Sequence, residues 1–175
     1  MRNGDWLQTA TGRQFWPIDP LPEDICIEDI AAALSKQCRF GGHCTRFYSV
    51  AEHCVLLSQR ASAHLKLGAL LHDAAEAYIV DVPRPLKKQI PHYELYETRL
   101  MECIATRFGF VFPLDEEVKR LDNAILADEQ LQCMKTAPAD WNLTEAPLGL
   151  RLQFFSPARA EWEFLMAFYR YGGRP

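Results

Sequence analysis

The apolar residues of this chain recur mostly at helical spacing. Between residues 27 and 36 they return every three or four positions, the period of a helix that buries one face. Similar patterns predict further helices over roughly 67–78, 93–108 and 116–135. The chain is therefore expected to be mainly helical.

Two polar signals predict the starts of further helices. Ser49, followed three residues later by Glu52, matches a capping box and predicts the helix that carries His53. Ser156 followed by Pro157 is typical of an N-cap with proline in the first turn. The final helix carries aromatic residues that we interpret as core or subunit interface rather than a base-stacking surface: Trp162, Phe164, Phe168 and Tyr169.

The first part of the chain follows a different pattern. Residues 6–9 and 13–16 are β-prone runs that predict a short hairpin, and three prolines then predict an extended linker. Two glycines break the periodicity within 37–48, which is expected to be a loop. The predicted fold is one mostly α domain over 1–175, with hairpin and linker at 1–26 and a helical core at 27–175.

Length and composition limit the class of protein. The chain has 175 residues, 49% of them hydrophobic and 24% charged, enough for one domain with a buried core. Its net charge of −4 argues against binding a nucleic-acid polymer. No apolar run approaches the roughly 18 residues of a membrane span, and the start has no signal pattern. Six cysteines without a Cys-x-x-Cys pair favour reduced thiols in the cytoplasm.

A histidine and an aspartate follow an apolar run in the predicted helix 67–78. His72 and Asp73 come directly after two leucines, and burying such a pair is costly unless something neutralises it. A divalent cation does so well. Glu76 lies one helical turn beyond His72, where its carboxylate can serve in proton transfer.

The order of acidic and histidine residues resembles a known enzyme family. His53, the pair His72-Asp73 and Asp122 follow the H…HD…D signature of the HD-domain phosphohydrolases. The motif at 71–76 and the Asp-x-Pro-x-Pro-x-Lys run at 81–87 are similar to the YfbR-like branch, whose members act on deoxynucleotides. Small phage enzymes that strip triphosphate from dATP resemble this branch too. The resemblance covers roughly residues 27–135 and implies an HD-type helical bundle.

The resemblance also implies roles for individual residues. One divalent metal ion (Zn, Co or Mn, with Mg as an alternative) would be held by His53, His72, Asp73 and Asp122. Glu76 would be the general acid or base, assisted by Asp81. The residues expected to contact the substrate are Arg39, Phe40, Gly42, Pro83 and Lys87. Phe40 stands where the family carries tryptophan.

Some residues compete for these roles. His43 lies beside the glycines of a loop, so the helical His53 is the preferred ligand. Asp128 is about 120° away from Asp122 around their helix, and we interpret it as a solvated carboxylate. His64 and His92 have no partner pattern and are expected at the surface. The scattered thiols Cys38, Cys44 and Cys54 are expected to be small buried apolar groups.

These observations favour a deoxynucleotide phosphohydrolase, with a dNTP triphosphohydrolase acting on dATP as the first hypothesis. Its products would be a deoxynucleoside and triphosphate. A 5′-nucleotidase acting on deoxynucleoside monophosphates is the alternative. A non-catalytic nucleotide sensor and a cyclic-nucleotide phosphodiesterase also remain open. The expected partner is a small nucleotide, and the resemblance implies a homo-oligomer, either a dimer or larger, in a bacterial cell or phage-infected host.

Overall fold

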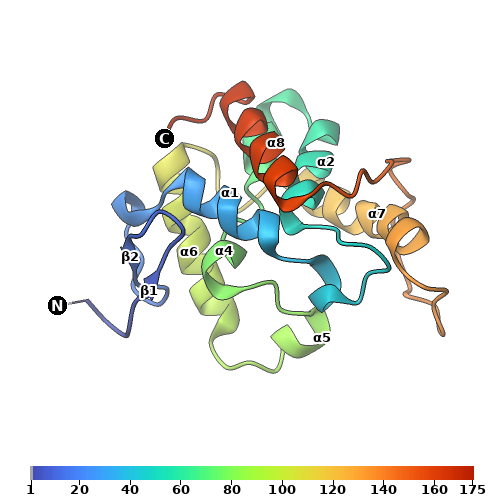
Figure 1. Ribbon diagram of the computed structural model, residues 1–175, viewed down its shortest axis with the longest axis horizontal. Coiled ribbons are helices and arrows are strands. Elements are labelled where there is room, and N and C mark those ends of the chain that lie inside the picture. Colours follow the sequence, from blue (N-terminus) through green and yellow to red (C-terminus); the bar gives the residue numbers. More distant parts are fainter. Residues whose placement is uncertain (1) are drawn as a thin grey trace.

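A computed structural model describes residues 2–175 and is mainly helical, as predicted (Figure 1). A short hairpin precedes the helices, and single turns of 3-10 helix connect several of them. The strands are β1 (Leu7–Gln8) and β2 (Gln14–Phe15); the helices are α1 (Ile27–Lys36), α2 (Val50–Arg60), α3 (Lys66–Leu70), α4 (Glu76–Ile79), α5 (Arg84–Lys87), α6 (Tyr93–Phe108), α7 (Glu116–Cys133) and α8 (Pro157–Arg170).

The N-terminal hairpin is present and is tied to the first helix. Leu7 pairs with Phe15 in the antiparallel ladder, so the predicted hairpin is confirmed with shorter strands. The turn that joins the strands donates its Thr11 amide and hydroxyl to the Asp29 carboxylate of α1, at 2.7 and 3.0 Å. The Phe15 ring is fully buried and stacks on Tyr78, with ring centroids 3.9 Å apart. The hairpin thereby covers one side of the helical core.

Helices α1, α2 and α8 pack together at the centre (Figure 1). Ser49 caps α2 by accepting a hydrogen bond from the Glu52 amide at 3.1 Å, as the capping-box pattern predicts. The Glu52 side chain does not complete that box. It is fully buried and accepts hydrogen bonds from the amides of residues 153–155 at 2.7–2.9 Å. Thus α2 anchors the segment that leads into α8.

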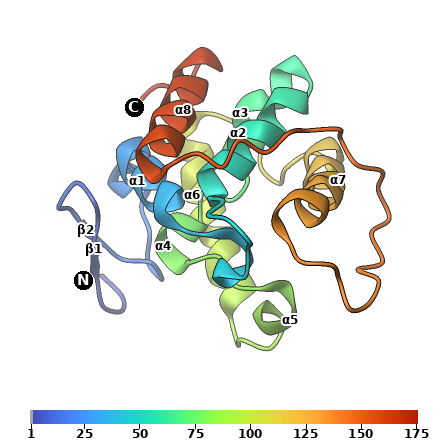
Figure 2. The ribbon, with the colours of Figure 1, turned by 45° about the vertical axis from the view of Figure 1, so that its right-hand side comes forward.

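The segment 134–156 contains neither helix nor strand, and Figure 2 shows it leaving α7 and returning across the molecule to α8. Backbone groups of this segment form hydrogen bonds with side chains of α7 instead of with a neighbouring strand. Asp128 accepts hydrogen bonds from the amides of Leu148 and Leu150, and Gln132 binds backbone groups of Leu150 and Leu152. The interpretation of Asp128 as a solvated carboxylate is therefore wrong, because this residue is 4% exposed and fully engaged.

The helix expected over 67–78 is interrupted. Helix α3 ends at Leu70 and α4 begins at Glu76, with a tight turn between them in which the amides of Ala74 and Glu76 bond to the carbonyls three residues back. The ring of His72 donates to the carbonyl of Ala69 at 2.8 Å, an acceptor that a continuous helix would use for a main-chain bond. His72 and Asp73 therefore occupy the turn, and Glu76 opens the next helix instead of sharing one helical face with His72.

The other predicted helices are confirmed with small changes in their ends. Helix α6 has the expected bounds, α7 ends two residues before 135, and the basic run after Pro83 contains the short helix α5. On α8, Phe164 and Phe168 are fully buried in the core, whereas Trp162 and Tyr169 are 49% and 47% exposed. Self-association through this exposed stripe stays a prediction.

The cysteines are free within the described part of the chain. Cys54 is buried as expected, but Cys38 and Cys44 are only half-buried. Across residues 2–175, none of the helices combines the length and apolar character that crossing a membrane requires.

Candidate metal centre and its cavity

The four predicted ligands converge from three parts of the fold. His53 comes from α2, His72 and Asp73 from the turn after α3, and Asp122 from α7. The Nε2 atom of His53 lies 3.2 Å from Nε2 of His72, 3.6 Å from Oδ2 of Asp73 and 3.4 Å from Oδ1 of Asp122. His72 Nε2 lies 3.2 Å from Asp73 and 3.9 Å from Asp122.

These separations fit a single divalent metal ion. Ligand atoms about 2.0–2.1 Å from a tetrahedral ion lie about 3.3 Å from one another. Imidazole nitrogen and carboxylate oxygen are suitable donors for zinc, cobalt and manganese. The cluster is also firmly held, because His53 is fully buried and the His72 side chain is 6% exposed. His53, His72 and Asp122 can therefore hold a metal ion, with Asp73 beside them.

The second nitrogen of each imidazole fixes the direction of the ring. His72 Nδ1 lies 2.8 Å from the Ala69 carbonyl, and His53 Nδ1 lies 2.7 Å from Oε1 of Glu129. Both partners are acceptors, so each Nδ1 carries the hydrogen and each Nε2 faces the carboxylates. Metal-binding histidines have this arrangement, in which an outer hydrogen bond selects the nitrogen that coordinates.

The carboxylates of the cluster carry an excess of negative charge, which a positive charge at the centre of the cluster would compensate. Burial opposes ionisation of His72, but the Asp73 carboxylate outweighs burial and raises the pKa of this imidazole. Burial would raise the pKa of Asp122, yet its hydrogen bond with His53 and the charge of His72 lower it to about 2. A proton on His72 supplies part of the compensating charge in the metal-free protein, and a cation would supply more.

Glu129 completes the centre, although the sequence reasoning missed it. It is fully buried on α7 and accepts hydrogen bonds from His53 and from Nη2 of Arg39 at 3.0 Å. Nη1 of Arg39 in turn lies 3.6 Å from Asp73. Glu129 stands seven residues after Asp122, which is two helical turns and the same face. That spacing is the signal that would have found it.

A cavity of about 660 Å³ opens beside the centre. This volume is within the range of small-molecule sites. Its wall includes the predicted residues Arg39, Phe40, Asp73, Glu76, Asp81, Pro83, Lys87 and Asp122, together with His43, Val82, Arg84, Pro85, Leu126, Met134, Trp141 and Leu143. Gly42 is exposed and, among the described residues, is not part of this lining.

Glu76 is the first residue of α4 and Asp81 follows its last residue by two positions, and Gln37 bonds to the backbone of both. The Gln37 amide donates to the Glu76 carbonyl at 2.9 Å and accepts from the Asp81 amide at 3.1 Å. Glu76 is 6% exposed, and its Oε2 atom has no hydrogen-bond partner among residues 2–175. Burial, followed by the charges of Asp73 and Asp81, raises the pKa of Glu76, and burial also raises that of Asp81. A carboxyl group with a raised pKa can both donate and accept a proton more readily, which suits proton transfer.

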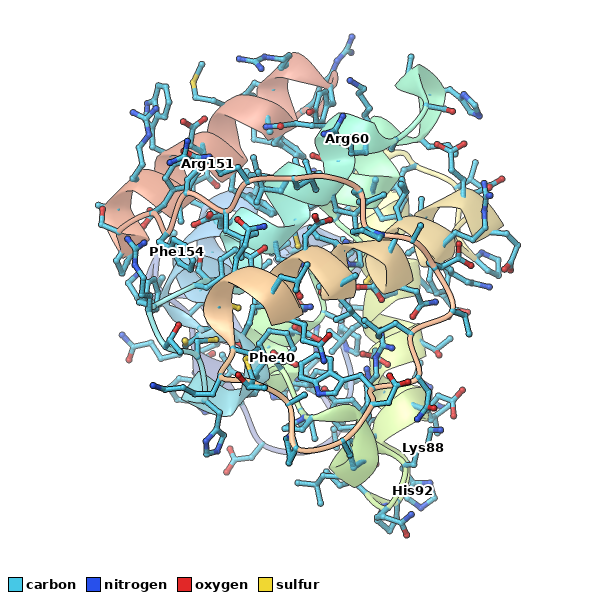
Figure 3. All side chains as sticks on the ribbon, turned by 90° about the vertical axis from the view of Figure 1, so that its right-hand side faces the viewer. Phe40, Arg60, Lys88, His92, Arg151 and Phe154 are labelled. Atoms are coloured by element: carbon cyan, nitrogen blue, oxygen red, sulfur yellow. The ribbon has the colours of Figure 1, made fainter. Side chains whose placement is uncertain are left out.

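The basic residues near the cavity already have partners. Lys87 lies 2.5 Å from Oε1 of Glu97, and Arg84 lies 2.9 Å from Oδ2 of Asp122. Lys88 is exposed at the end of α5, where Figure 3 shows it near His92. The predicted surface position of His92, and that of His64, is confirmed.

Two alternative ligands occupy different settings. His43 is exposed on the cavity wall, outside the cluster of His53 and His72. The Cys54 sulfur could form a second group with His72 and Asp73. Burial raises the pKa of Cys54 to about 11, which keeps the thiol protonated and disfavours it as a ligand at neutral pH.

The fold and the site define a mainly helical protein with a buried histidine–aspartate cluster suited to a divalent metal ion. The chain is 40% identical over 125 residues to the uncharacterized protein YfdR of Escherichia coli K12, covering 71% of this chain and 70% of YfdR. It therefore belongs to the same family as YfdR. It is also 36% identical over 151 residues to the uncharacterized protein RCAP_rcc00048 of Rhodobacter capsulatus, covering 77% of each chain. Comparison with models of known protein families finds no match.

Proposed function

We propose that this protein is a divalent-metal-dependent phosphohydrolase of the HD-domain type that acts on 2′-deoxynucleotides, with deoxynucleoside triphosphates as the first candidates. The observation that carries this proposal is the placement of two carboxyl groups, Glu76 and Asp81, in the same cavity wall as Asp73 and Asp122 of the candidate metal centre. Metal ligands and groups for proton transfer thus face one space.

The residues around the cavity have distinct roles in this proposal. A divalent ion held by the cluster would supply the Lewis-acid charge that attack on a phosphorus atom requires. Glu76 would move a proton between the attacking water and the leaving oxygen, and Asp81 would orient that water. The leaving oxygen is the 5′-oxygen of the sugar, so a triphosphate would give deoxynucleoside and triphosphate.

Phosphate recognition would fall to the cationic side chains in the wall. Arg39, Arg84 and Lys87 line the cavity, and each pairs with a carboxylate of the protein. An incoming phosphate would compete with these carboxylates for the same donors. The same wall carries four carboxylates, Asp73, Glu76, Asp81 and Asp122, so these cations would favour a small anionic substrate once a divalent ion adds its positive charge.

A product assay tests the proposal. Purified protein loaded with Mn²⁺, Co²⁺ or Zn²⁺ is incubated with the four dNTPs, the four dNMPs and ATP, and the products are separated by ion exchange. We expect triphosphate release from at least one dNTP, with dATP the first candidate. The Glu76→Gln variant should retain metal but lose about 100-fold or more in turnover. The matched control is Glu94→Gln, an exposed residue of α6.

The same assay separates the alternatives. Phosphate release from dNMPs alone would assign a 5′-nucleotidase. Full activity in Glu76→Gln would overturn the role of that residue. If the metal-loaded protein hydrolyses none of these nucleotides, the phosphohydrolase proposal is overturned. A nucleotide sensor or an enzyme that acts on cyclic nucleotides would then be favoured.

A further inference from the structure

The cavity beside the candidate metal centre has an aromatic and apolar part. Phe40 and Trp141 line it together with Met134 and Leu143, whereas acidic and basic side chains line the part near the metal ligands. The two rings are in contact, with centroids 5.8 Å apart and planes inclined by 56°. A ligand that reaches both parts needs a charged group and a flat apolar group.

Arg39 connects the aromatic pair to the metal centre. Its guanidinium carbon lies 5.3 Å from the centre of the Phe40 ring, and its Nη1 lies 3.6 Å from Asp73. The order along this wall is therefore metal ligand, arginine, Phe40 and Trp141. A nucleotide has its phosphate, sugar and base in a comparable order.

The Phe40 backbone is held in a conformation that few residues of its type adopt. Its φ of 56° lies in the left-handed region, and Gly41 follows at 60°. Such strain costs about 1–3 kcal/mol and persists only where surrounding contacts impose it. Here the amide of Arg39 bonds to Tyr48 and the amide of His43 bonds to Phe40 itself, so both sides of the strained position are fixed. Figure 3 shows Phe40 below one end of α7, where the segment 134–156 begins.

Trp141 lies in that segment, and hydrogen bonds fix its position although the segment contains neither helix nor strand. The segment is tied to α7 and α2 through residues 148–155. It begins directly after Cys133, the last residue of α7, whose carbonyl accepts from the Thr45 amide at 2.7 Å. The amide of Asn142 bonds to the side chain of Asp140 at 2.8 Å and forms a local turn around Trp141. The indole is half-buried, which leaves part of it free to meet a ligand.

We propose that Trp141 is the residue on which the nucleobase stacks, with Phe40 supporting the indole from its other side. This inference rests on the proposed function, since it names the part of the substrate that the aromatic region binds. Base–aromatic stacking serves every base because each has a π-face. The aromatic region would thus bind any nucleobase with little preference among bases. Selectivity for one base would have to come from other groups such as His43.

The first test compares a nucleotide with the same phosphate ester lacking a base. In Trp141→Leu, which keeps an apolar side chain, we expect KM for the best deoxynucleotide to rise about 5- to 100-fold. Hydrolysis of the matching ester without a base, deoxyribose 5-triphosphate for a dNTP or deoxyribose 5-phosphate for a dNMP, should change less than twofold in the same variant. Trp141→Phe should restore most of the affinity. Trp162→Leu, an exposed tryptophan of α8, is the control and should match wild type.

The second test does not require hydrolysis. Deoxyadenosine, which carries a base but no phosphate, is titrated into metal-free protein while tryptophan fluorescence is recorded. We expect quenching in wild type and in Trp162→Phe, and its loss in Trp141→Phe. Quenching without any nucleotide hydrolysis would support the stacking site and overturn the proposed function. Hydrolysis with an unchanged KM in Trp141→Leu, or equal quenching in Trp141→Phe, would overturn the stacking site alone.

Discussion

The Nε2 atoms of His53 and His72 lie 3.2 Å apart, although His53 belongs to α2 and His72 to the turn after α3. Each ring is turned toward the other by a hydrogen bond on its far side, from Nδ1 to Glu129 in one case and to Ala69 in the other. Two nitrogens and two carboxylates facing one point form an unfavourable arrangement unless positive charge lies between them.

Removal of metal should lower the thermal stability of the protein. A ligand present at about 100 times its dissociation constant stabilises the native state by about 2.7 kcal/mol, which raises the Tm of a chain of this size by about 5–10 °C. We expect this rise when Zn²⁺, Co²⁺ or Mn²⁺ is added to chelator-treated protein in a thermal scan. His72→Ala should abolish the rise and the metal content, whereas the exposed His43→Ala should keep both. Equal loss in both variants would contradict the ligand assignment.

Glu129→Gln should weaken metal binding without touching a ligand. The change keeps the volume of the side chain but removes the carboxylate that orients His53 and pairs with Arg39. Loss of such an outer partner typically costs 10- to 100-fold in metal affinity. Titration with a competing metal indicator measures this change.

Asp128 provides the matched control for Glu129, because it is its buried neighbour on α7 but bonds the segment after α7 instead of the metal centre. Asp128→Asn should lower Tm and leave metal affinity within about twofold. If the Glu129→Gln variant binds metal with wild-type affinity, His53 does not need the hydrogen bond to the Glu129 carboxylate for metal binding.

Cobalt binding should distinguish the two possible ligand groups. If His53, His72 and the aspartates hold the ion, the Co²⁺ protein should lack a thiolate-to-cobalt charge-transfer band, since no sulfur then coordinates the metal. Absorption spectroscopy of wild type at pH 7.5 is the measurement. Cys54→Ala should give the same spectrum and the same cobalt content, and a thiolate band that this variant loses would place sulfur at the metal.

Glu76→Gln should stabilise the metal-free protein at alkaline pH. Burial raises the pKa of Glu76, so the native state favours its protonated form, and this favourable contribution is lost as pH rises from the unfolded pKa through the folded one. A buried carboxylate oxygen without a partner costs on the order of 1–3 kcal/mol, which corresponds to about 2–12 °C in Tm. In thermal scans with chelator, the variant should have a higher Tm than wild type at pH 8, and this difference in Tm should vanish below about pH 4.5.

The exposed Glu94→Gln should show no such pH-dependent gain. A variant of Glu76 that is less stable than wild type at pH 8 would mean that its carboxylate is favourable where it lies. The same substitution is expected to lower turnover about 100-fold or more, so stability and activity would change in opposite directions at one residue.

Periodicity and capping signals were sufficient to predict most of the fold. The hairpin, the starts of α2 and α8 and the bounds of α6 follow from local patterns, which apply wherever main-chain bonds and one buried face decide the structure. The break between α3 and α4 could not be predicted in this way. It accompanies a side-chain hydrogen bond from His72 to the Ala69 carbonyl, and no apolar pattern reports such a bond.

The residues of the candidate site were predictable to the extent that they follow a family signature. His53, His72, Asp73 and Asp122 converge as the resemblance implies, but Glu129 lies outside that signature and was missed. Trp141 lies in a segment without periodicity, so only the folded chain brings it to Phe40. The solvated interpretation of Asp128 failed because its partners are main-chain amides 20 and 22 residues away, which a local pattern cannot reveal.

The buried carboxylate of Glu52 gives the metal centre a dependence on the far end of the chain. Glu52 precedes His53 and is satisfied by the amides of residues 153–155. A nascent or truncated chain that ends before these residues leaves a buried acceptor group without partners, one position from a ligand. We therefore expect the helix that carries His53 to gain this support only when residues 153–155 have been synthesised and have packed against it.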